Sequence, residues 1–228
     1  MQSGIVKTML ALFFFIDKGF DENYILLAEP AFSFSPNEYI GIHRRLFHGI
    51  YKHAGKIRDY NITKREWVLD GATVLYGSAS ELRATLEYDF RQEKNFDYHD
   101  LSMDEIIRHL ASFISRLWQI HIFGEGNTRT TAVFFIKYLR SLGFAATNDI
   151  FAENAWYFRN ALVRANYTDL QKGIHETTEY IEIFLRNLLL DEKHSLQNRT
   201  LLLSNLVQAG IIEPVSGHGK GKYRFVKR

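Results

Sequence analysis

The stretch from residue 121 to residue 135 reads HIFGEGNTRTTAVFF and lies near the middle of the 228-residue chain. It follows a run whose apolar residues recur with helical spacing, and its two glycines and one asparagine interrupt that run. A second apolar run with helical character begins directly after the interruption. The stretch therefore predicts two helices joined by a short turn, with a histidine, an acid and an arginine gathered around it.

The run before the turn is the clearest helix in the sequence. Residues 101–121 read LSMDEIIRHLASFISRLWQIH, in which Ser102 and Glu105 have the spacing of a capping box. The positions on one face of this helix are Leu110, Ile114, Leu117 and His121. His121 is therefore expected at the C-terminal end of the helix, with its side chain toward the core. Residues 129–144 follow as a nearly all-apolar, central helix.

Further helices are expected on both sides of this pair. Residues 35–55 carry start signals, with Ser35 as a cap and Pro36 in the first turn. Glu38 has the spacing to complete a capping box, and Gly55 can end the helix. Three more segments have helical spacing, at residues 78–94, 152–166 and 177–190.

One segment departs from helical spacing. Residues 66–77 read EWVLDGATVLYG, in which two β-rich runs flank an Asp-Gly pair, the strongest short signal for a β-hairpin. The chain is therefore predicted to be mainly α, with one β-hairpin in the helical bundle. We expect an N-terminal helical segment at residues 1–34, a main helical domain at residues 35–192 and a C-terminal appendage at residues 193–228.

The C-terminal appendage differs in character from the rest of the chain. It reads as a short helix, a turn and a basic, glycine-containing hairpin or tail. A partial winged helix, whose wing would touch DNA phosphates, is one interpretation. A solvated tail or a small packing appendage is the other. Elsewhere a nucleic-acid partner is not expected, because the net charge is only +2.

The composition of the chain also argues against disulfide-bonded, thiolate-metal, secreted and membrane proteins. With 46% hydrophobic residues the chain can bury a sizeable core, and the absence of cysteine excludes disulfides, thiolate metal sites and a cysteine nucleophile. The apolar run at residues 8–16 follows Lys7 and resembles part of a secretory signal, but no small-residue cleavage site follows it. The run is also too short to cross a bilayer. We therefore expect a core helix in a cytoplasmic protein without a membrane partner.

The residues of the central turn are suited to phosphate chemistry. Gly126 and Asn127 tolerate positive φ, and the first amides of the next helix have no partner within it, so together they can form an anion cradle. Arg129 can neutralise a phosphate, and Glu125 is a suitable ligand for Mg²⁺. His121, four residues before Glu125, is placed to take a proton from an incoming hydroxyl.

Each of these residues also has an ordinary structural explanation. His121 alone is a satisfied core residue, Gly126 a helix terminator and Arg129 a surface ion-pair partner. Glu125 alone is a solvated carboxylate, and Thr128 only caps the next helix. These explanations do not account for the clustering, so the joint pattern favours a site that handles phosphate.

The same residues resemble the signature of Fic-domain proteins, His-x-Phe-x-Asp/Glu-Gly-Asn-Gly-Arg-x-x-Arg. The matching positions are His121, Phe123, Glu125, Gly126, Asn127 and Arg129. The resemblance to the Fic/DOC family extends over about residues 35–190, including the helix IHRRLFHGIYKHAGKIR and the hairpin that follows it. It implies a Fic-like helical bundle in which the β-hairpin is the family's flap.

The resemblance also implies an activity, the transfer of AMP from ATP to a Ser, Thr or Tyr hydroxyl of a target protein. In this assignment His121 is the general base and Phe123 anchors the turn in the core. Glu125 binds a Mg²⁺ ion that bridges the α- and β-phosphates, and Arg129 stabilises charge on the β-phosphate. The phosphates themselves would be held by the amides around Gly126, Asn127 and Thr128.

The flap of such a protein would hold a target segment by strand addition. Its contacting residues are expected to be Val74, Leu75 and Tyr76. Ordinary packing of a hairpin is the alternative explanation for these three residues.

The match has two departures. Thr128 replaces the glycine that follows the asparagine, and Ala132 replaces the second arginine, which in the family contacts the γ-phosphate. Two alternatives therefore stay open. One is transfer of another phosphate-containing group, such as phosphate or phosphocholine, on the same scaffold. The other is an inactive Fic-like binding module whose C-terminus contacts DNA or a partner.

Fic enzymes are commonly restrained by a Ser/Thr-x-x-x-Glu helix whose glutamate pairs with that second arginine. The nearest matches here are residues 33–37, which end in Asn37, and residues 178–182, which lack the following Gly or Asn. Because Ala132 also removes the arginine, we expect no inhibition within the chain by this route. Restraint would come from homo-oligomer assembly, a separate inhibitory partner or the availability of the target.

Overall fold

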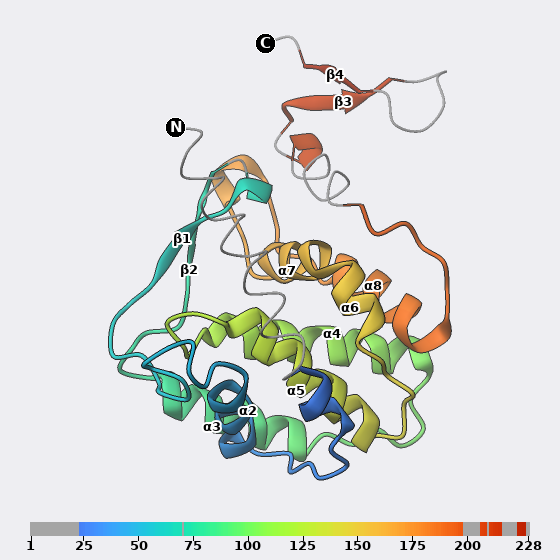
Figure 1. Cartoon of the computed structure of the whole chain (residues 1–228). Coiled ribbons are helices and arrows are strands. Elements are labelled where there is room, and N and C mark those ends of the chain that lie inside the picture. The colour runs from blue at the N-terminus through green and yellow to red at the C-terminus, as the bar shows by residue number, and fades with distance from the viewer. Residues whose placement is uncertain (1–22, 70, 198–205, 209, 216–222, 227–228) are drawn as a thin grey trace.

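The computed structural model describes residues 23–69, 71–197, 206–208, 210–215 and 223–226. These residues form a mainly helical fold with small antiparallel hairpins, as expected (Figure 1). The helices are α2 (Pro36–Leu46), α3 (Leu82–Lys94), α4 (Met103–Ile120), α5 (Asn127–Ser141), α6 (Asp149–Glu153), α7 (Ala155–Arg164) and α8 (Glu179–Leu190). The short 3-10 helices are η1 (Trp67–Leu69) and η2 (Leu170–Lys172). The strands are β1 (Thr63–Arg65), β2 (Thr73–Leu75), β3 (Ile212–Pro214) and β4 (Tyr223–Phe225).

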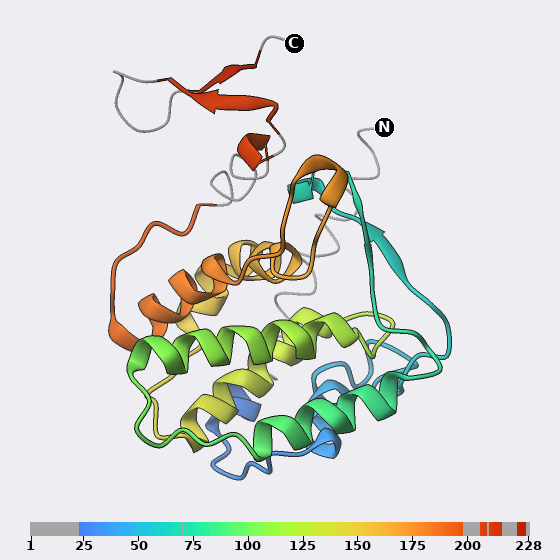
Figure 2. The ribbon, with the colours of Figure 1, turned by 180° about the vertical axis from the view of Figure 1, so that it is seen from behind.

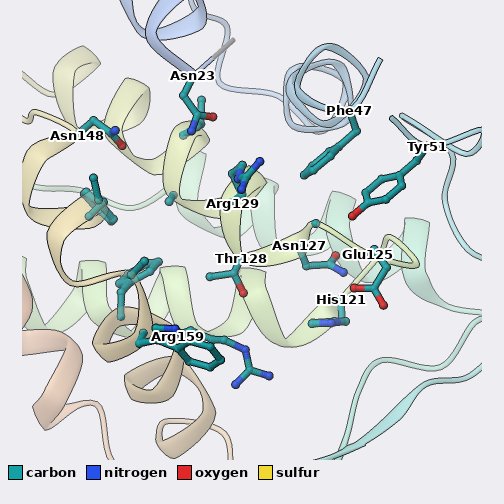
Figure 3. Close-up of a pocket in the computed structure, with 18 of the residues that line it drawn as sticks. Asn23, Phe47, Tyr51, His121, Glu125, Asn127, Thr128, Arg129, Asn148 and Arg159 are labelled. Carbon is teal, nitrogen blue, oxygen red and sulfur yellow. The ribbon is translucent and has the colours of Figure 1, made fainter. Parts of the chain in front are cut away.

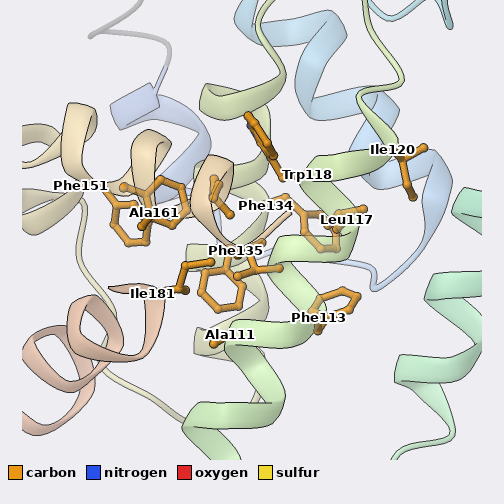
Figure 4. Packing of buried hydrophobic residues seen from close by; sticks show 14 of the residues in the cluster. Ala111, Phe113, Leu117, Trp118, Ile120, Phe134, Phe135, Phe151, Ala161 and Ile181 are labelled. Carbon is orange, nitrogen blue, oxygen red and sulfur yellow. The ribbon is translucent and has the colours of Figure 1, made fainter. Parts of the chain in front are cut away.

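The helices α4 and α5 form the centre of the bundle. Helix α4 packs against α3, α5, α7 and α8, while α5 packs against α2 as well. Their facing side chains, including Leu117 and Trp118 of α4 and Phe134 and Phe135 of α5, are almost completely buried (Figure 4). This apolar contact holds the end of α4 and the start of α5 together, and the turn between them carries the candidate site.

The start of α4 agrees in detail with the sequence prediction. Ser102 Oγ accepts from the amide of Glu105 at 3.3 Å, and Glu105 Oε2 accepts from the amide of Ser102 at 2.9 Å. This reciprocal pair is the predicted capping box. The helix ends at Ile120 because His121 takes the left-handed conformation, with φ 51° and ψ 52°.

The first helix of the bundle is shorter than predicted. Helix α2 begins after Ser35, whose hydroxyl accepts from the amide of Glu38 at 3.2 Å, but it ends at Leu46 and not at Gly55. The following residues form turns, because Gly49 and Gly55 both have φ of 73° and fold the chain back on itself. The amide of Gly55 then donates to His43 Nδ1 at 2.8 Å, which closes this turn onto α2.

The hairpin is present, but the prediction of its first strand was wrong. The strands β1 and β2 pair antiparallel with Lys64 opposite Val74, so the first strand lies before residues 66–69. Residues 67–69 form η1 instead, and the side chains of Val68 and Leu69 are buried in the core. Their apolar character therefore reflects burial in a turn and not a strand. Figures 1 and 2 show the hairpin extending along one side of the helical body.

The two ends of the chain are described in part. The predicted core helix at residues 8–16 lies outside the described residues, whereas residues 23–28 are helical and residues 29–34 are not. The ammonium group of Lys137 on α5 donates to the carbonyls of Leu26 and Glu29 at 2.9 and 3.1 Å, which ties this segment to the bundle.

At the C-terminal end, residues 206–208 are helical and β3 pairs antiparallel with β4. The predicted helix and hairpin of the appendage are thus present, while the basic loop at residues 216–222 lies outside the described residues. The division at residue 192 and the winged-helix interpretation stay predictions. None of the helices in the described part of the chain has the length and apolar character needed to span a bilayer.

Candidate active site

A cavity of about 380 Å³ opens at the N-terminal end of α5. One wall is the turn that joins α4 to α5, with Lys64 of β1 beside it. Phe47 and Tyr51 line a second side, and residues 148–159 of α6 and α7 line a third. The close-up in Figure 3 shows the side chains of this turn gathered around the cavity. All the turn residues that the sequence singled out, from His121 to Arg129, are therefore brought to one place, with Phe123 behind the wall.

His121 is held tightly where α4 ends. Its side chain and backbone are only 4% exposed, and its ring stacks on that of Tyr76 with centroids 3.9 Å apart. Trp118 meets the imidazole edge-on at 5.2 Å. Arg58 Nε donates to the carbonyl of His121 at 2.7 Å, which supports the left-handed backbone. Nδ1 of the ring is buried and has no hydrogen-bond partner among the described residues.

This environment keeps the imidazole neutral. Burial, together with the positive charges of Lys64, Arg159 and Arg58, lowers the pKa of His121 to about 3. A neutral imidazole near pH 7 has a free lone pair and can accept a proton. The buried position keeps His121 unprotonated and able to accept a proton, while the nearby cations oppose the positive charge that the ring would gain.

The turn itself is fixed by the side chain of Asn127. Its Oδ1 accepts from the amide of Phe123 at 3.0 Å, and its Nδ2 donates to the carbonyl of Phe123 at 2.8 Å. The Phe123 ring is fully buried and stacks on His43, with centroids 3.7 Å apart. Asn127 therefore closes the turn from inside, while Phe123 fastens it to the core.

Gly126 has both a conformational and a steric requirement. Its φ of 79° lies in the left-handed region, and a Cβ at this position would lie 2.5 Å from Cζ of Phe47. The absence of a side chain lets Phe47 close over the turn, and the same ring lies 5.7 Å below the guanidinium of Arg129. Gly126 also precedes α5, so the first amides of that helix face the cavity without partners in the helix.

A second histidine supports the turn from α2. His43 Nδ1 accepts from the amide of Gly55 at 2.8 Å, so its Nε2 carries the proton and donates to the carbonyl of Glu125 at 3.0 Å. Burial lowers the pKa of His43 to about 4. His43 is thus a neutral donor that sets the direction of one peptide group in the turn, and the sequence analysis did not single it out.

Arg129 and Thr128 differ in how their polar groups are used. Arg129 is partly buried, its pKa is lowered by that burial, and its Nη1 has no hydrogen-bond partner among the described residues. A buried, unpartnered guanidinium favours an anionic ligand. Thr128 Oγ1 instead accepts from Trp118 Nε1 at 2.9 Å. Its hydroxyl is thereby engaged with α4, which accommodates a side chain where the sequence pattern has glycine.

Glu125 is the candidate cation ligand. Its side chain is 61% exposed and its Oε2 lies 3.8 Å from Lys64 Nζ. No group of three or more His, Cys, Asp or Glu side chains in the described residues could hold a metal ion by itself. A single carboxylate does suit Mg²⁺, which keeps several waters and is usually bound together with substrate phosphates.

The three residues predicted for the flap lie in three different environments. Val74 is buried, Leu75 is 69% exposed, and Tyr76 lies against His121. The carbonyl of Leu75 also accepts from Gln119 Nε2 at 2.6 Å. Of the three, Leu75 is exposed, Tyr76 is half-buried and Val74 is buried.

Sequence reasoning missed the residues that reach the site from distant parts of the chain. Arg159 of α7 lines the cavity, and its guanidinium makes two hydrogen bonds of 2.8 Å to the carboxylate of Glu66. Arg58 was missed as well. Ala132 lies in the cavity wall, at the position of the second motif arginine. Glu182 accepts from Thr178 at 2.6 Å within the first turn of α8 and does not line the cavity.

This combination defines a class of protein, a helical domain in which a glycine-containing turn joins the two central helices and carries a histidine, an acid and an arginine. Residues 33–139 match the model of the Fic/DOC family. The resemblance read from the sequence is thereby confirmed. The comparison with curated proteins found no match to this sequence.

Solved structures support the same fold. The N-terminal Fic domain of the effector protein Bep8 from Bartonella sp. 1-1C matches with a TM-score of 0.58 and 17% identity, over 77% of this chain and 84% of that chain. The BepC protein from Bartonella tribocorum, with bound AMPPNP, matches with a TM-score of 0.58 and 19% identity, over 76% and 83%. A putative cell filamentation protein from Bartonella quintana, whose N-terminal Fic domain has bound ADP, matches with a TM-score of 0.56 and 21% identity, over 83% and 88%.

Proposed function

We propose that the protein is an adenylyltransferase that moves AMP from ATP to a Ser, Thr or Tyr hydroxyl of a target protein. The observation that carries the proposal is that one cavity contains both a neutral imidazole and a guanidinium whose Nη1 has no hydrogen-bond partner among the described residues. His121 can accept a proton there, and Arg129 can stabilise phosphate charge. The catalytic unit would be residues 35–192, in the cytoplasm.

The proposed step is an in-line displacement at the α-phosphorus. The target hydroxyl oxygen forms a bond to the α-phosphorus, and its proton passes to His121. The bond from the α-phosphorus to the oxygen that bridges it to the β-phosphate breaks, and pyrophosphate leaves. The amides around Gly126, Asn127 and Thr128 hold the phosphates, while Arg129 stabilises the charge that develops on the leaving group. Catalysis would rest on positioning and electrostatics, with no covalent enzyme intermediate.

The proposal includes a magnesium ion held by Glu125. Its exposed carboxylate beside the turn fits an ion that is otherwise coordinated by phosphates and water. When bound, the ion supplies positive charge to the α- and β-phosphates. The protein's own part is to hold Glu125 near them, which the bond from His43 to the Glu125 carbonyl supports.

Two other functions compete with this proposal. Ala132 leaves the cavity without the second motif arginine, which keeps open the transfer of another phosphate-containing group on the same scaffold. An inactive binding module, whose C-terminal appendage contacts DNA or a partner, is the second. Retention of His121, Glu125 and Arg129 around one cavity argues against the inactive module. Glu182 accepts a hydrogen bond from Thr178 at the start of its own helix, so it is not proposed as an inhibitory residue. The proposal therefore includes restraint by a homo-oligomer or by a separate inhibitory partner.

Labelled nucleotides separate these functions. A cell lysate incubated with the full chain, Mg²⁺ and α-labelled ATP should yield labelled protein, and His121→Ala should reduce the label by about 10²–10⁴-fold while ATP still binds. Label from γ-labelled ATP alone would show phosphate transfer instead. If neither nucleotide labels protein, the result would support the inactive binding module. Wild-type labelling by His121→Ala would overturn the mechanism.

A further inference from the structure

A line of contacts leads from the cavity wall to the imidazole of His121. Arg159 of α7 donates from Nη1 and Nη2 to the two carboxylate oxygens of Glu66, at 2.8 Å each. The Glu66 side chain is 3% exposed and the Arg159 side chain 25%. Glu66 lies directly after β1, and its amide donates to the carbonyl of Ala72 at 3.0 Å. The ion pair therefore joins the flap hairpin to α7.

The line continues through Tyr76. Its hydroxyl donates to Glu66 Oε1 at 3.4 Å, and its ring lies on the imidazole of His121 at 3.9 Å with an angle of 24° between the planes. Tyr76 and Glu66 belong to the hairpin, whereas His121 ends α4 and Arg159 belongs to α7. Three separate parts of the fold thus meet through one buried carboxylate and one aromatic ring.

The hairpin cannot hold its own position. Each of its strands has only three residues, and an isolated two-stranded hairpin is marginally stable at best. Arg58 fixes its two ends, donating to the carbonyls of Tyr60 and, at 2.5 Å, of Gly77. Between those ends, Gln119 of α4 donates to the carbonyl of Leu75 at 2.6 Å and Val74 is buried, and the ion pair with Arg159 joins the hairpin to α7. A buried ion pair is weak evidence for stability alone, but it does fix geometry when both oxygens are engaged.

We propose that the Glu66–Arg159 pair is a clasp that holds the flap closed, so that Tyr76 covers one face of the His121 imidazole. Glu66, Arg159 and Tyr76 are then positioning residues for the transfer step. The expected effect on transfer activity rests on the proposed function. The covering of His121 by Tyr76 does not depend on that function. The closed flap leaves the edge of the imidazole, and not its face, for a target hydroxyl that enters from the cavity.

Opening the clasp has a consequence for the charge of His121. Burial under Tyr76 keeps water from the imidazole, so exposure to water should raise its pKa toward the ordinary value. The charged groups that face it are Lys64 from β1, Arg159 from α7 and Arg58 from the segment before β1. Glu66 stands behind Tyr76. In Glu66→Gln a negative charge is lost and these cations stay, so electrostatics alone would lower the pKa, whereas an open flap raises it.

The variants for the test are made in the full chain. Glu66→Gln and Arg159→Gln each remove one side of the clasp, and the double variant with Glu66→Arg and Arg159→Glu restores a pair of opposite sign. Tyr76→Ala removes the cover without leaving a buried charge unpaired. Arg83→Gln is the matched control, because Arg83 forms an exposed pair with Glu87 on α3.

The first measurement is the titration of the His121 ring by NMR, which needs no activity. The wild-type and control rings should stay mostly neutral from about pH 8 down to about pH 4, while Glu66→Gln and Tyr76→Ala should raise the pKa of His121 by about one unit or more, so that their rings take up protons within this range. The double variant should lie closer to wild type than Glu66→Gln does. An unchanged or lowered pKa of His121 in both Glu66→Gln and Tyr76→Ala would overturn the clasp.

The second measurement is transfer from α-labelled ATP, with nucleotide affinity measured separately. Glu66→Gln and Tyr76→Ala should each lower kcat by about tenfold and shift the pH profile of transfer, while the Kd for ATP changes by less than about twofold. If the clasp served only the nucleotide site, Kd would rise and kcat would not fall, which would also overturn the proposal. A raised pKa of His121 in a chain that labels nothing would support the clasp and count against the proposed function alone.

Discussion

Arg58 Nε donates to the backbone carbonyl of His121 at 2.7 Å, although 63 positions separate the two residues. The same guanidinium also donates to the carbonyl of Ile120 at 3.4 Å and to both ends of the flap hairpin, at Tyr60 and Gly77. Its four acceptors are all backbone carbonyls, including two at the C-terminal end of α4, where a cation is also favoured by the helix dipole. Arg58 therefore sets the direction of the backbone that carries the candidate base.

Replacement of Arg58 by lysine tests this arrangement. Lysine keeps the charge but cannot present the planar fork that reaches four carbonyls, so several buried acceptors lose their donors. We expect the free energy of unfolding to fall by about 2–3 kcal/mol and transfer activity to fall with it. Urea unfolding gives the first quantity and α-labelled ATP the second. Arg83→Lys on the exposed face of α3 should leave both unchanged, and wild-type stability of Arg58→Lys would contradict the assignment.

The stability of the protein should depend on pH through its two buried histidines. The folded pKa values of His43 and His121 are about 4 and about 3 because both rings are buried. In the unfolded chain both would titrate near about 6.5. As pH falls below that value the unfolded chain binds protons that the folded chain does not. The free energy of unfolding should therefore drop by up to about 1.4 kcal/mol per pH unit for each histidine.

This dependence can be measured by urea unfolding at several pH values between about 7 and about 5. The contribution is complete above the unfolded pKa and is lost as pH falls toward the folded values. His43→Gln should reduce the slope, whereas His48→Gln at an exposed position should not. An equal slope in wild type and His43→Gln would show that the His43 ring is not held neutral.

Gly126→Ala should damage the anion-binding turn. The added Cβ would meet the Phe47 ring at 2.5 Å in a left-handed backbone, so we expect a loss of about 1–3 kcal/mol in the free energy of unfolding. ATP affinity, measured by calorimetry, should fall by about tenfold or more, equivalent to about 1.4 kcal/mol. Gly71→Ala provides the control, because Gly71 has φ of 78° but open space around it. Equal effects of the two substitutions would mean that Phe47 does not close on the turn.

Glu125→Ala should weaken the response to magnesium. Because Glu125 is the carboxylate beside the turn, its loss should raise the Mg²⁺ concentration for half-maximal labelling by about tenfold or more. Glu87→Ala on α3 is the matched surface control. Titration of Mg²⁺ in the α-labelled ATP assay measures this concentration. Full activity of the wild type in excess chelator would show that Glu125 is not a Mg²⁺ ligand.

Local sequence signals predicted the part of the site that is local in sequence. The capping box at Ser102, the glycine turn and the following helix are all set by neighbouring residues, so the positions of His121 and Arg129 could be predicted. The hairpin was predicted but its first strand was misplaced. The apolar residues of η1 resemble a strand, and only their burial against the core distinguishes the two.

The rest of the site depends on long-range contacts that no local signal encodes. Arg58, Glu66 and Arg159 each carry a charge that is common on protein surfaces, and their spacing to the central turn has no periodicity. Only the folded chain brings Arg159 to a carboxylate 93 positions away. The stacking of Tyr76 on His121 is another long-range contact that the sequence does not reveal, since a tyrosine at the end of a strand is equally suited to face solvent.

The cavity extends beyond the segment that defines the family. Residues 33–139 supply the turn, but Asn23 precedes that segment, and α6 and α7 follow it, and all of these line the cavity. Nδ2 and Oδ1 of an asparagine can each recognise a ligand group, and Oδ1 of Asn23 is buried with no partner among the described residues. The turn and the rest of the cavity lining thus come from different stretches of one chain. Selection can alter the flanks while the central turn stays constant, so homologues with the same turn need not share a substrate.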